Sequence, residues 1–147
     1  MKTVLFLCTG NYYRSRFAEV LFNHLAQLAK LSWRADSSGL ALEFGTFNIG
    51  PISRDTLAQL KTCGISHNPS RNPKQCTVDE LKQANLVVAL KEAEHRPMLK
   101  RRYPGWAERV EYWHVHDLDQ ATADAALSEI DLHVRALIER LKQDEHG

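Results

Sequence analysis

The stretch that decides the fold is Val4-Leu5-Phe6-Leu7-Cys8-Thr9-Gly10-Asn11-Tyr12-Tyr13-Arg14-Ser15. It opens with an uninterrupted apolar run, which is typical of a strand buried on both faces of a parallel sheet. The next segment, residues 15–31, carries Phe17, Leu21 and Leu25 at helical spacing. A buried strand, a short polar loop and an amphipathic helix are therefore predicted to follow one another directly.

The loop between this strand and this helix favours binding of an oxyanion. A short loop that curls into a helix N-terminus turns successive backbone N–H groups inward, where they bind oxygens. Gly10 would allow a positive φ and close backbone approach. Asn11 tolerates a left-handed conformation, and its side-chain amide can brace the loop. The loop is therefore predicted to bind phosphate or arsenate.

Cys8 and Arg14 stand at the two ends of this loop and are the predicted catalytic pair. The helix N-terminus and the guanidinium both favour an anion, so we expect Cys8 to be a thiolate at neutral pH. The planar fork of Arg14 can hold two phosphate oxygens at once, and Ser15 can donate a hydrogen bond to the sulfur when it leaves. The Cys-x5-Arg spacing alone is a weak signal and leaves open a buried structural cysteine beside a surface arginine.

The remainder of the chain alternates strands with helices. Further strands are expected at residues 33–38, 86–90 and 110–115, and further helices at residues 53–64, 92–102 and 122–142. Another short helix is expected to start at Thr77, and Ser53 and Thr77 are the expected N-caps. The glycine-rich stretch 40–52 is expected to form no regular element and to border the site. This order predicts an α/β fold, a single-domain doubly wound sandwich with a four-stranded parallel sheet and helices on both faces.

Composition limits the classes of function. The chain has 147 residues, of which 44% are hydrophobic, and a formal net charge of +1. This fits one domain over residues 1–147. The net charge is too small to predict the positive surface that a nucleic-acid partner would need. The N-terminal apolar run is too short for a signal peptide or a membrane span, so no membrane partner is expected. Three cysteines without a disulfide pattern fit a reducing, cytoplasmic location.

The opening stretch, continued by Arg16-Phe17-Ala18-Glu19, resembles the start of the low-molecular-weight protein tyrosine phosphatases. Weaker similarities are Asp36-Ser37-Ser38-Gly39 and the segment Gly64–Arg71. The resemblance implies a cysteine-dependent phosphatase without metal or other cofactor, working through a cysteinyl-phosphate intermediate. Its substrate would be a phosphorylated protein or a small phosphoester. The implied catalytic residues are Cys8, Arg14 and Asp117, and the implied substrate-binding residues are Thr9, Gly10, Asn11, Tyr12, Tyr13 and Ser15.

A general acid is expected where the strand at residues 110–115 ends, because that end shares a sheet edge with Cys8. Protonation of the leaving oxygen typically contributes 10²- to 10⁴-fold to the rate. Members of the family carry Asp-Pro at this place, and the resemblance assigns the role to Asp117. The chain reads Asp117-Leu118-Asp119-Gln120 instead, so Asp119 is a competitor.

The walls of the pocket also depart from the family. Relatives that act on phosphotyrosine often carry aromatic residues after Asp-Pro, and this chain does not. Phe44 and Phe47 can supply an aromatic wall or can belong to the core. Tyr12 is expected at the pocket mouth, where its bulk helps to select the substrate.

Three other functions stay open. A phosphoarginine or other small phosphoester phosphatase is suggested by the Cys-Thr-Gly-Asn start, although such relatives carry threonine where this chain has Tyr12. The altered acid loop allows a catalytically weak phosphate- or phosphopeptide-binding protein. A thioredoxin-coupled arsenate reductase needs two further cysteines close together, and the last cysteine here is Cys76. His114 and His116 lack evident partner ligands, so no metal is expected, and the chain is expected to be a monomer or weak dimer.

Overall fold

The computed structural model describes residues 1–48, 50–66, 71–115 and 123–146. Within them, four parallel strands form one sheet in the order β2-β1-β3-β4. The strands are β1 (Lys2–Cys8), β2 (Trp33–Gly39), β3 (Leu86–Ala89) and β4 (Glu111–Tyr112). β1 lies in the centre because its apolar run is completely buried on both faces, as the sequence predicts.

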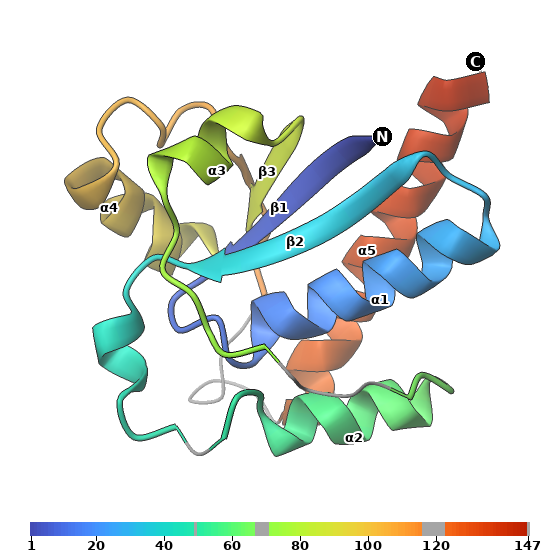
Figure 1. The fold of residues 1–147 in the computed structure, drawn as a ribbon, viewed down its shortest axis with the longest axis horizontal. Helices are drawn as coiled ribbons and strands as arrows, with labels where there is room; N and C mark the ends of the chain where they lie inside the picture. The colour runs from blue at the N-terminus through green and yellow to red at the C-terminus, as the bar shows by residue number, and fades with distance from the viewer. Residues whose placement is uncertain (49, 67–70, 116–122, 147) are drawn as a thin grey trace.

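Helices cover both faces of the sheet (Figure 1). On one face lie α1 (Arg14–Leu28) and α5 (Ala123–His146), against which α2 (Arg54–Thr62) packs. On the other face lie α3 (Val78–Gln83) and α4 (Glu92–Arg102). The apolar side chains form two cores, one centred on Phe6 and Phe17 and the other on Leu5 and Leu99. The predicted doubly wound α/β sandwich is thereby confirmed.

Local capping signals fix the starts of two helices. The Ser53 side chain accepts hydrogen bonds from the backbone N–H groups of Asp55 and Thr56 at the start of α2. Thr77 and Glu80 form a reciprocal capping box at the start of α3. Both predicted N-caps are therefore confirmed, because each depends only on residues within one helical turn.

Several predicted bounds differ from the structure. Helix α1 ends at Leu28 instead of residue 31, and α5 continues to His146 instead of ending at residue 142. The stretch at residues 40–52 was expected to be irregular, but Leu42–Gly45 forms a short 3₁₀ helix, η1. The strand predicted at residues 110–115 is reduced to β4, Glu111–Tyr112, because only these residues pair with Val88 and Ala89. Beyond β4 a single antiparallel bridge joins His114 to Lys91. A strand at the sheet edge has one neighbour and needs less length than a central one.

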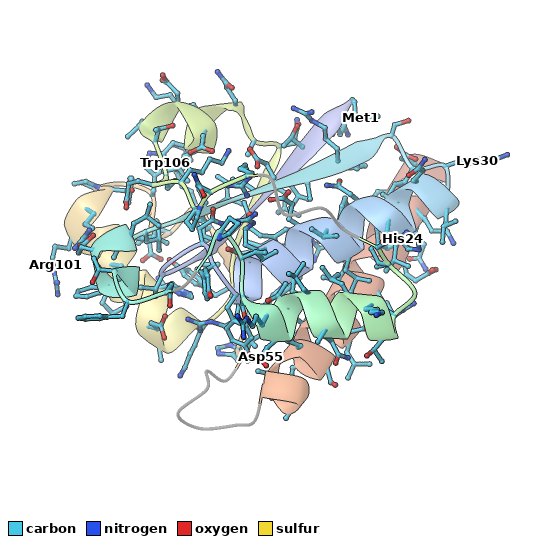
Figure 2. The ribbon with its side chains drawn as sticks, turned by 60° about the horizontal axis from the view of Figure 1, so that its bottom comes forward. Met1, His24, Lys30, Asp55, Arg101 and Trp106 are labelled. Atoms are coloured by element: carbon cyan, nitrogen blue, oxygen red, sulfur yellow. The ribbon has the colours of Figure 1, made fainter. Side chains whose placement is uncertain are left out.

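The topology brings the loops that follow the strands to one end of the molecule. The loop after β1 meets the segment after β2 there, because Cys8 pairs with Gly39 in the register. In Figure 2, Asp55 lies at the start of α2, away from Met1 and Lys30 at the end where β1 begins. Ligands of open α/β sheets bind beyond the carboxyl ends of strands, so this end is the place to look for a site.

Candidate active site

Cys8 is the last residue of β1, and its sulfur faces the amino end of α1. The Sγ atom lies 2.8 Å from Ser15 Oγ, and the backbone N–H of Asn11 donates a hydrogen bond to Sγ at 3.3 Å. The predicted contact between Ser15 and the sulfur is confirmed. These two contacts hold the sulfur at the base of the loop.

Asn11 braces the loop and is completely buried. Its Nδ2 group donates to the hydroxyls of Ser15 and Ser37, both at 2.9 Å. Its Oδ1 atom accepts from Arg71 Nη1 at 3.0 Å and from the backbone N–H of Lys74 at 3.1 Å. The side chain therefore links the loop after β1 to β2 and to the segment before α3, as its predicted bracing role requires.

The left-handed position of the loop falls on Asn11, with φ of 50°. The sequence allows a positive φ at Gly10 as well, but the chain makes its left-handed turn at Asn11, one residue later. Asparagine tolerates this conformation because its short polar side chain hydrogen-bonds locally. The four hydrogen bonds of its amide over-determine the conformation.

The other glycine that shapes the loop is Gly39, at the end of β2. A Cβ atom there would come within 2.7 Å of the carbonyl oxygen of Thr9 and of the Leu42 side chain. Two backbone hydrogen bonds follow Gly39 in the chain. The N–H of Leu40 donates to the carbonyl oxygen of Cys8 at 2.9 Å, and the N–H of Ala41 donates to that of Thr9 at 3.0 Å. Only glycine allows the two loops to approach this closely.

Arg14 is held by a carboxylate that the sequence analysis did not single out. Its Nη2 atom lies 2.8 Å from Glu94 Oε2, on α4, and the two side chains are 9% and 22% exposed. The same Oε2 atom accepts a hydrogen bond from the Thr9 hydroxyl and lies 3.0 Å from His95 Nε2. Glu94 thus joins both ends of the loop to α4.

His95 supports Glu94 as a neutral donor. Its Nδ1 atom accepts the backbone N–H of Lys91 at 3.0 Å, so the neutral ring carries its proton on Nε2, facing Glu94. Burial lowers the pKa of His95, and the hydrogen bond to Glu94 only partly opposes this. Burial also disfavours the charged form of Glu94, but His95 and Arg14 together hold the pKa of this carboxyl well below its usual range.

Two further arginines lie behind the loop. The guanidinium of Arg71 binds Glu19 Oε1 and Ser37 Oγ, both at 2.9 Å, in addition to Asn11. Arg16, in the first turn of α1, is buried and donates to backbone carbonyl oxygens. Neither arginine was predicted as a site residue. The only sequence signal for Arg16 is its place two residues after Arg14 in the opening motif.

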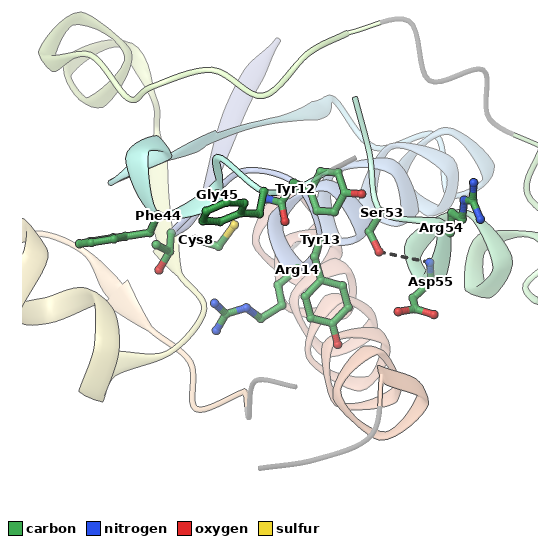
Figure 3. Close-up of a pocket in the computed structure, with 13 residues that line it drawn as sticks. Cys8, Tyr12, Tyr13, Arg14, Phe44, Gly45, Ser53, Arg54 and Asp55 are labelled. Atoms are coloured by element: carbon green, nitrogen blue, oxygen red, sulfur yellow. Dashed lines mark hydrogen bonds between the residues drawn. The ribbon is translucent and has the colours of Figure 1, made fainter. Parts of the chain in front are cut away.

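A pocket of about 530 Å³ opens over the loop. Figure 3 shows Phe44 on one side and Ser53, Arg54 and Asp55 on the other, with Tyr12 and Tyr13 between. Phe44 and Phe47 line the pocket while being 67% and 96% exposed, so neither belongs to the core. The expectation that the stretch 40–52 borders the site is confirmed.

The predicted binding residues divide into two groups. The pocket is lined by Cys8, Thr9, Gly10, Tyr12, Tyr13 and Arg14. Asn11 and Ser15 lie behind the loop, completely buried, and act on it through hydrogen bonds. The two aspartates predicted as alternatives for the general acid, Asp117 and Asp119, lie outside the described residues.

The rest of the described chain offers few other candidate sites. No group of three metal-ligating side chains occurs in residues 1–48, 50–66, 71–115 and 123–146. Over the same ranges, no helix combines the length and the apolar character that a membrane crossing requires. Cys8, Cys63 and Cys76 are all free thiols.

Known proteins share the sequence pattern and the fold. The family model described as low molecular weight phosphotyrosine protein phosphatase matches residues 3–146. A chicken (Gallus gallus) protein of that description is 32% identical over 108 residues, which cover 69% of this chain and 62% of that protein. The chain therefore spans less than two-thirds of the length of this curated relative.

Two solved structures illustrate the similarity of fold. The low molecular weight protein tyrosine phosphatase from T. tengcongensis is 25% identical with a TM-score of 0.77, over 98% of this chain and 99% of that one. The YwlE arginine phosphatase from Geobacillus stearothermophilus is 23% identical with a TM-score of 0.76, over 100% of this chain and 98% of that one. At 23% identity, the second likeness concerns the fold alone.

Proposed function

The chain belongs to the low molecular weight phosphotyrosine protein phosphatase family, and from this premise we propose that it hydrolyses phosphomonoesters, phosphotyrosine in proteins foremost, through a cysteinyl-phosphate intermediate. The observation that carries the proposal is the placement of Cys8 Sγ. It lies at the amino end of α1, within hydrogen-bond reach of Ser15 Oγ and the Asn11 N–H, on the floor of a pocket that Arg14 also lines.

The proposed reaction has two displacement steps. The Cys8 thiolate attacks phosphorus, the bond from phosphorus to the ester oxygen breaks, and Asp117 protonates the leaving oxygen. The Asp117 carboxylate then takes a proton from water, which attacks the cysteinyl phosphate and releases inorganic phosphate and the thiolate. Arg14 and the loop N–H groups of residues 9–14 hold the equatorial oxygens, and Ser15 donates to the departing sulfur.

The lining of the pocket supports an aryl phosphate as substrate. Four aromatic side chains, Tyr12, Tyr13, Phe44 and Phe47, surround the space above the loop. Aromatic pairs add about 0.5–1.5 kcal/mol beyond the burial of area, which favours a phenyl ring over an alkyl chain. Phe44 and Phe47 would thus supply the wall that the family's residues after Asp-Pro supply elsewhere.

Phosphoarginine is the second candidate substrate, and Asp55 is the observation that favours it. Its carboxylate belongs to the pocket lining together with the aromatic rings. A guanidinium group stacks on aromatic faces and pairs with carboxylates, so the same pocket offers it both kinds of contact. The relative named as an arginine phosphatase shares the fold.

A disulfide relay of the arsenate reductase type fits the cysteines poorly. Cys8 belongs to the core that α1 and α5 cover, whereas Cys76 belongs to the core on the other face of the sheet. Burial raises the pKa of the Cys76 thiol to about 11. A thiol with such a pKa is scarcely ionised at neutral pH and is a slow attacking group.

The proposal is tested with p-nitrophenyl phosphate in the presence of a chelator. The wild type is expected to turn over and to be inhibited by vanadate, and Cys8→Ser is expected to lose turnover while still binding vanadate. Cys63→Ser is the matched control and should keep its activity. Near wild-type activity in Cys8→Ser would overturn the nucleophile, and a wild type that binds vanadate without turnover would make the chain a phosphate-binding protein.

A second measurement compares the two candidate substrates, phosphotyrosine and phosphoarginine. The ratio of kcat/KM for a phosphotyrosine peptide to that for a phosphoarginine peptide is expected to exceed one, and a ratio below one would favour the second candidate. We also propose that residues 1–147 act as one phosphatase domain. A cytoplasmic location is consistent with its three free thiols.

A further inference from the structure

Arg16 is a cation buried directly behind the anion-binding loop. Its residue is 1% exposed, although it stands in the first turn of α1. Nη1 donates to the carbonyl oxygen of Asn11 at 3.3 Å and to that of Pro51 at 2.9 Å. Nη2 donates to the carbonyl oxygen of Arg71 at 2.8 Å. One side chain therefore joins the loop, the segment before α2 and the segment before α3.

The charge of Arg16 is compensated only at a distance. Each hydrogen bond that its guanidinium makes among the described residues ends at a backbone carbonyl oxygen. Burial and the nearby Arg71 lower its pKa, whereas Glu19, Cys8 and Asp36 act in the opposite direction. An arginine remains protonated in proteins, so this site retains a buried positive charge.

A buried charge without a direct counter-ion is costly, and an anion placed nearby reduces that cost. Cys8, the nucleophile of the proposed function, would be one such anion as a thiolate, because Asn11 donates its N–H to Cys8 Sγ and accepts from Arg16 through its carbonyl oxygen. An oxyanion bound on the other side of the loop would be a second. Arg14 is already paired with Glu94, so Arg16 supplies positive charge that no carboxylate among the described residues contacts directly.

We propose that Arg16 is a positioning residue for the reaction: its guanidinium clamps the anion-binding loop to two flanking segments, and its charge stabilises the Cys8 thiolate and the bound oxyanion from behind. The inference rests on the proposed function of Cys8. It gives Arg16 a role distinct from that of Arg14, which lines the pocket and faces the substrate.

Charged groups on several elements lie around the anion-binding loop and Arg16. They are Arg14 and Glu19 on α1, Asp36 on β2, Arg71 and Lys74 before α3, and Glu94 with neutral His95 on α4. A substitution at Arg16 removes none of these charged groups. The change in the titration of Cys8 between variants therefore reports on Arg16 itself.

The test measures the rate at which iodoacetamide alkylates Cys8 as a function of pH, with mass spectrometry of the Cys8 peptide to separate it from Cys63 and Cys76. Arg16→Gln keeps hydrogen-bond donors without the charge, and Arg16→Lys keeps the charge without the planar fork. Arg140→Gln is the control, because Arg140 is exposed and pairs with Glu111 on β4, two strands away from β1 in the sheet. Vanadate affinity and thermal unfolding are recorded for each variant.

Arg16→Gln is expected to raise the midpoint of the alkylation profile by about one pH unit and to weaken vanadate binding about tenfold, because a buried cation at an effective dielectric of about 20 is screened much less than one in water. Arg16→Lys should restore the midpoint to within a few tenths of a pH unit while unfolding at a lower temperature than the wild type. If Arg16 had a purely structural role, the alkylation midpoints of the two variants would instead shift by the same amount. Arg140→Gln should leave the midpoint unchanged.

Unchanged midpoints in both Arg16 variants, or equal shifts in both, would overturn the proposed electrostatic role. Arg16→Met replaces Arg16→Gln in the comparison if the glutamine variant does not fold. Failure of the proposed function looks different, because wild-type protein would then not hydrolyse p-nitrophenyl phosphate, whereas the alkylation profiles and vanadate affinities do not depend on turnover.

Discussion

The variant Glu94→Gln tests the charge of the carboxylate beside Arg14 while keeping the shape of the side chain. Glutamine is nearly isosteric and keeps one acceptor oxygen for Arg14, Thr9 and His95. It removes the negative charge, so the ion pair with Arg14 becomes a hydrogen bond from a cation to a neutral oxygen and the contacts with Thr9 and His95 become neutral. The variant is therefore expected to fold with the same contacts but with a smaller free energy of unfolding.

The magnitude follows from the contacts of Glu94 Oε2. Hydrogen bonds to a charged group contribute about 1.5–3 kcal/mol and neutral ones about 0.5–1.5 kcal/mol, so the contact with neutral His95 loses roughly 1 kcal/mol. The contact with Arg14 loses the Coulomb attraction between the two charges, which is about 1 kcal/mol or less for a partly exposed pair. Two contacts, with Arg14 at 2.8 Å and with His95 at 3.0 Å, have ordinary lengths. Because the Glu94 side chain is 22% exposed, solvent recovers part of the sum, and we expect a loss of about 1–2 kcal/mol at pH 7.

The pH dependence has a defined sign. The pKa of Glu94 is lower in the folded state than in the unfolded chain, where it lies near the ordinary value of about 4.3. Its carboxylate therefore contributes stability above that unfolded value, and this contribution is lost as the pH falls toward the folded value. The difference between wild type and Glu94→Gln should be full at pH 7 and should shrink as the pH is lowered below about 4.

Urea unfolding followed by circular dichroism at pH 7, 5 and 3.5 measures both effects. Glu108→Gln is the matched control, because Glu108 also pairs with an arginine on α4 but is 76% exposed. Its loss should stay below about 0.5 kcal/mol. The reasoning is refuted if Glu94→Gln is no less stable than this control at pH 7, or if its deficit stays constant down to pH 3.5.

Two further predictions concern the reaction. Asp117→Asn should slow hydrolysis of p-nitrophenyl phosphate by about 10²- to 10⁴-fold, far more than Asp119→Asn, and steady-state kinetics showing the reverse ranking would move the general acid to Asp119. Phe47→Ala should lower kcat/KM for aryl phosphates about two- to tenfold, since one aromatic contact adds about 0.5–1.5 kcal/mol. It should leave a small alkyl phosphate unaffected, and equal losses on both esters would argue against a wall that contacts the substrate ring.

The elements that the sequence predicted well are those with local signals. The helix at residues 92–102 has the predicted bounds, and Ser53 and Thr77 cap their helices as expected. A cap or a helical repeat depends on residues within one or two turns, so one chain segment carries the whole signal. The strand at residues 110–115 is shorter than predicted, because its extent depends on pairing with β3.

Within the site, the opening motif predicted which residues gather but not all of their conformations. Cys8, Arg14 and Ser15 are neighbours in the sequence, and the strand–loop–helix order brings them together. The opening motif left the left-handed position open between Gly10 and Asn11. Asn11 takes it because its amide finds partners on Ser37, Arg71 and Lys74, none of which lies near it in the sequence.

By itself, the sequence determined the α/β class, the order of the elements and the oxyanion-binding loop, because apolar periodicity and a contiguous motif are local properties. Only the tertiary structure decided the electrostatics of that loop. Glu94 is separated from Arg14 by 80 positions, and Arg16 binds the carbonyl of Arg71 across 55. Such pairs leave no trace in a local pattern, since Coulomb interactions and hydrogen bonds depend on distance in space, and packing of the sheet and helices sets that distance.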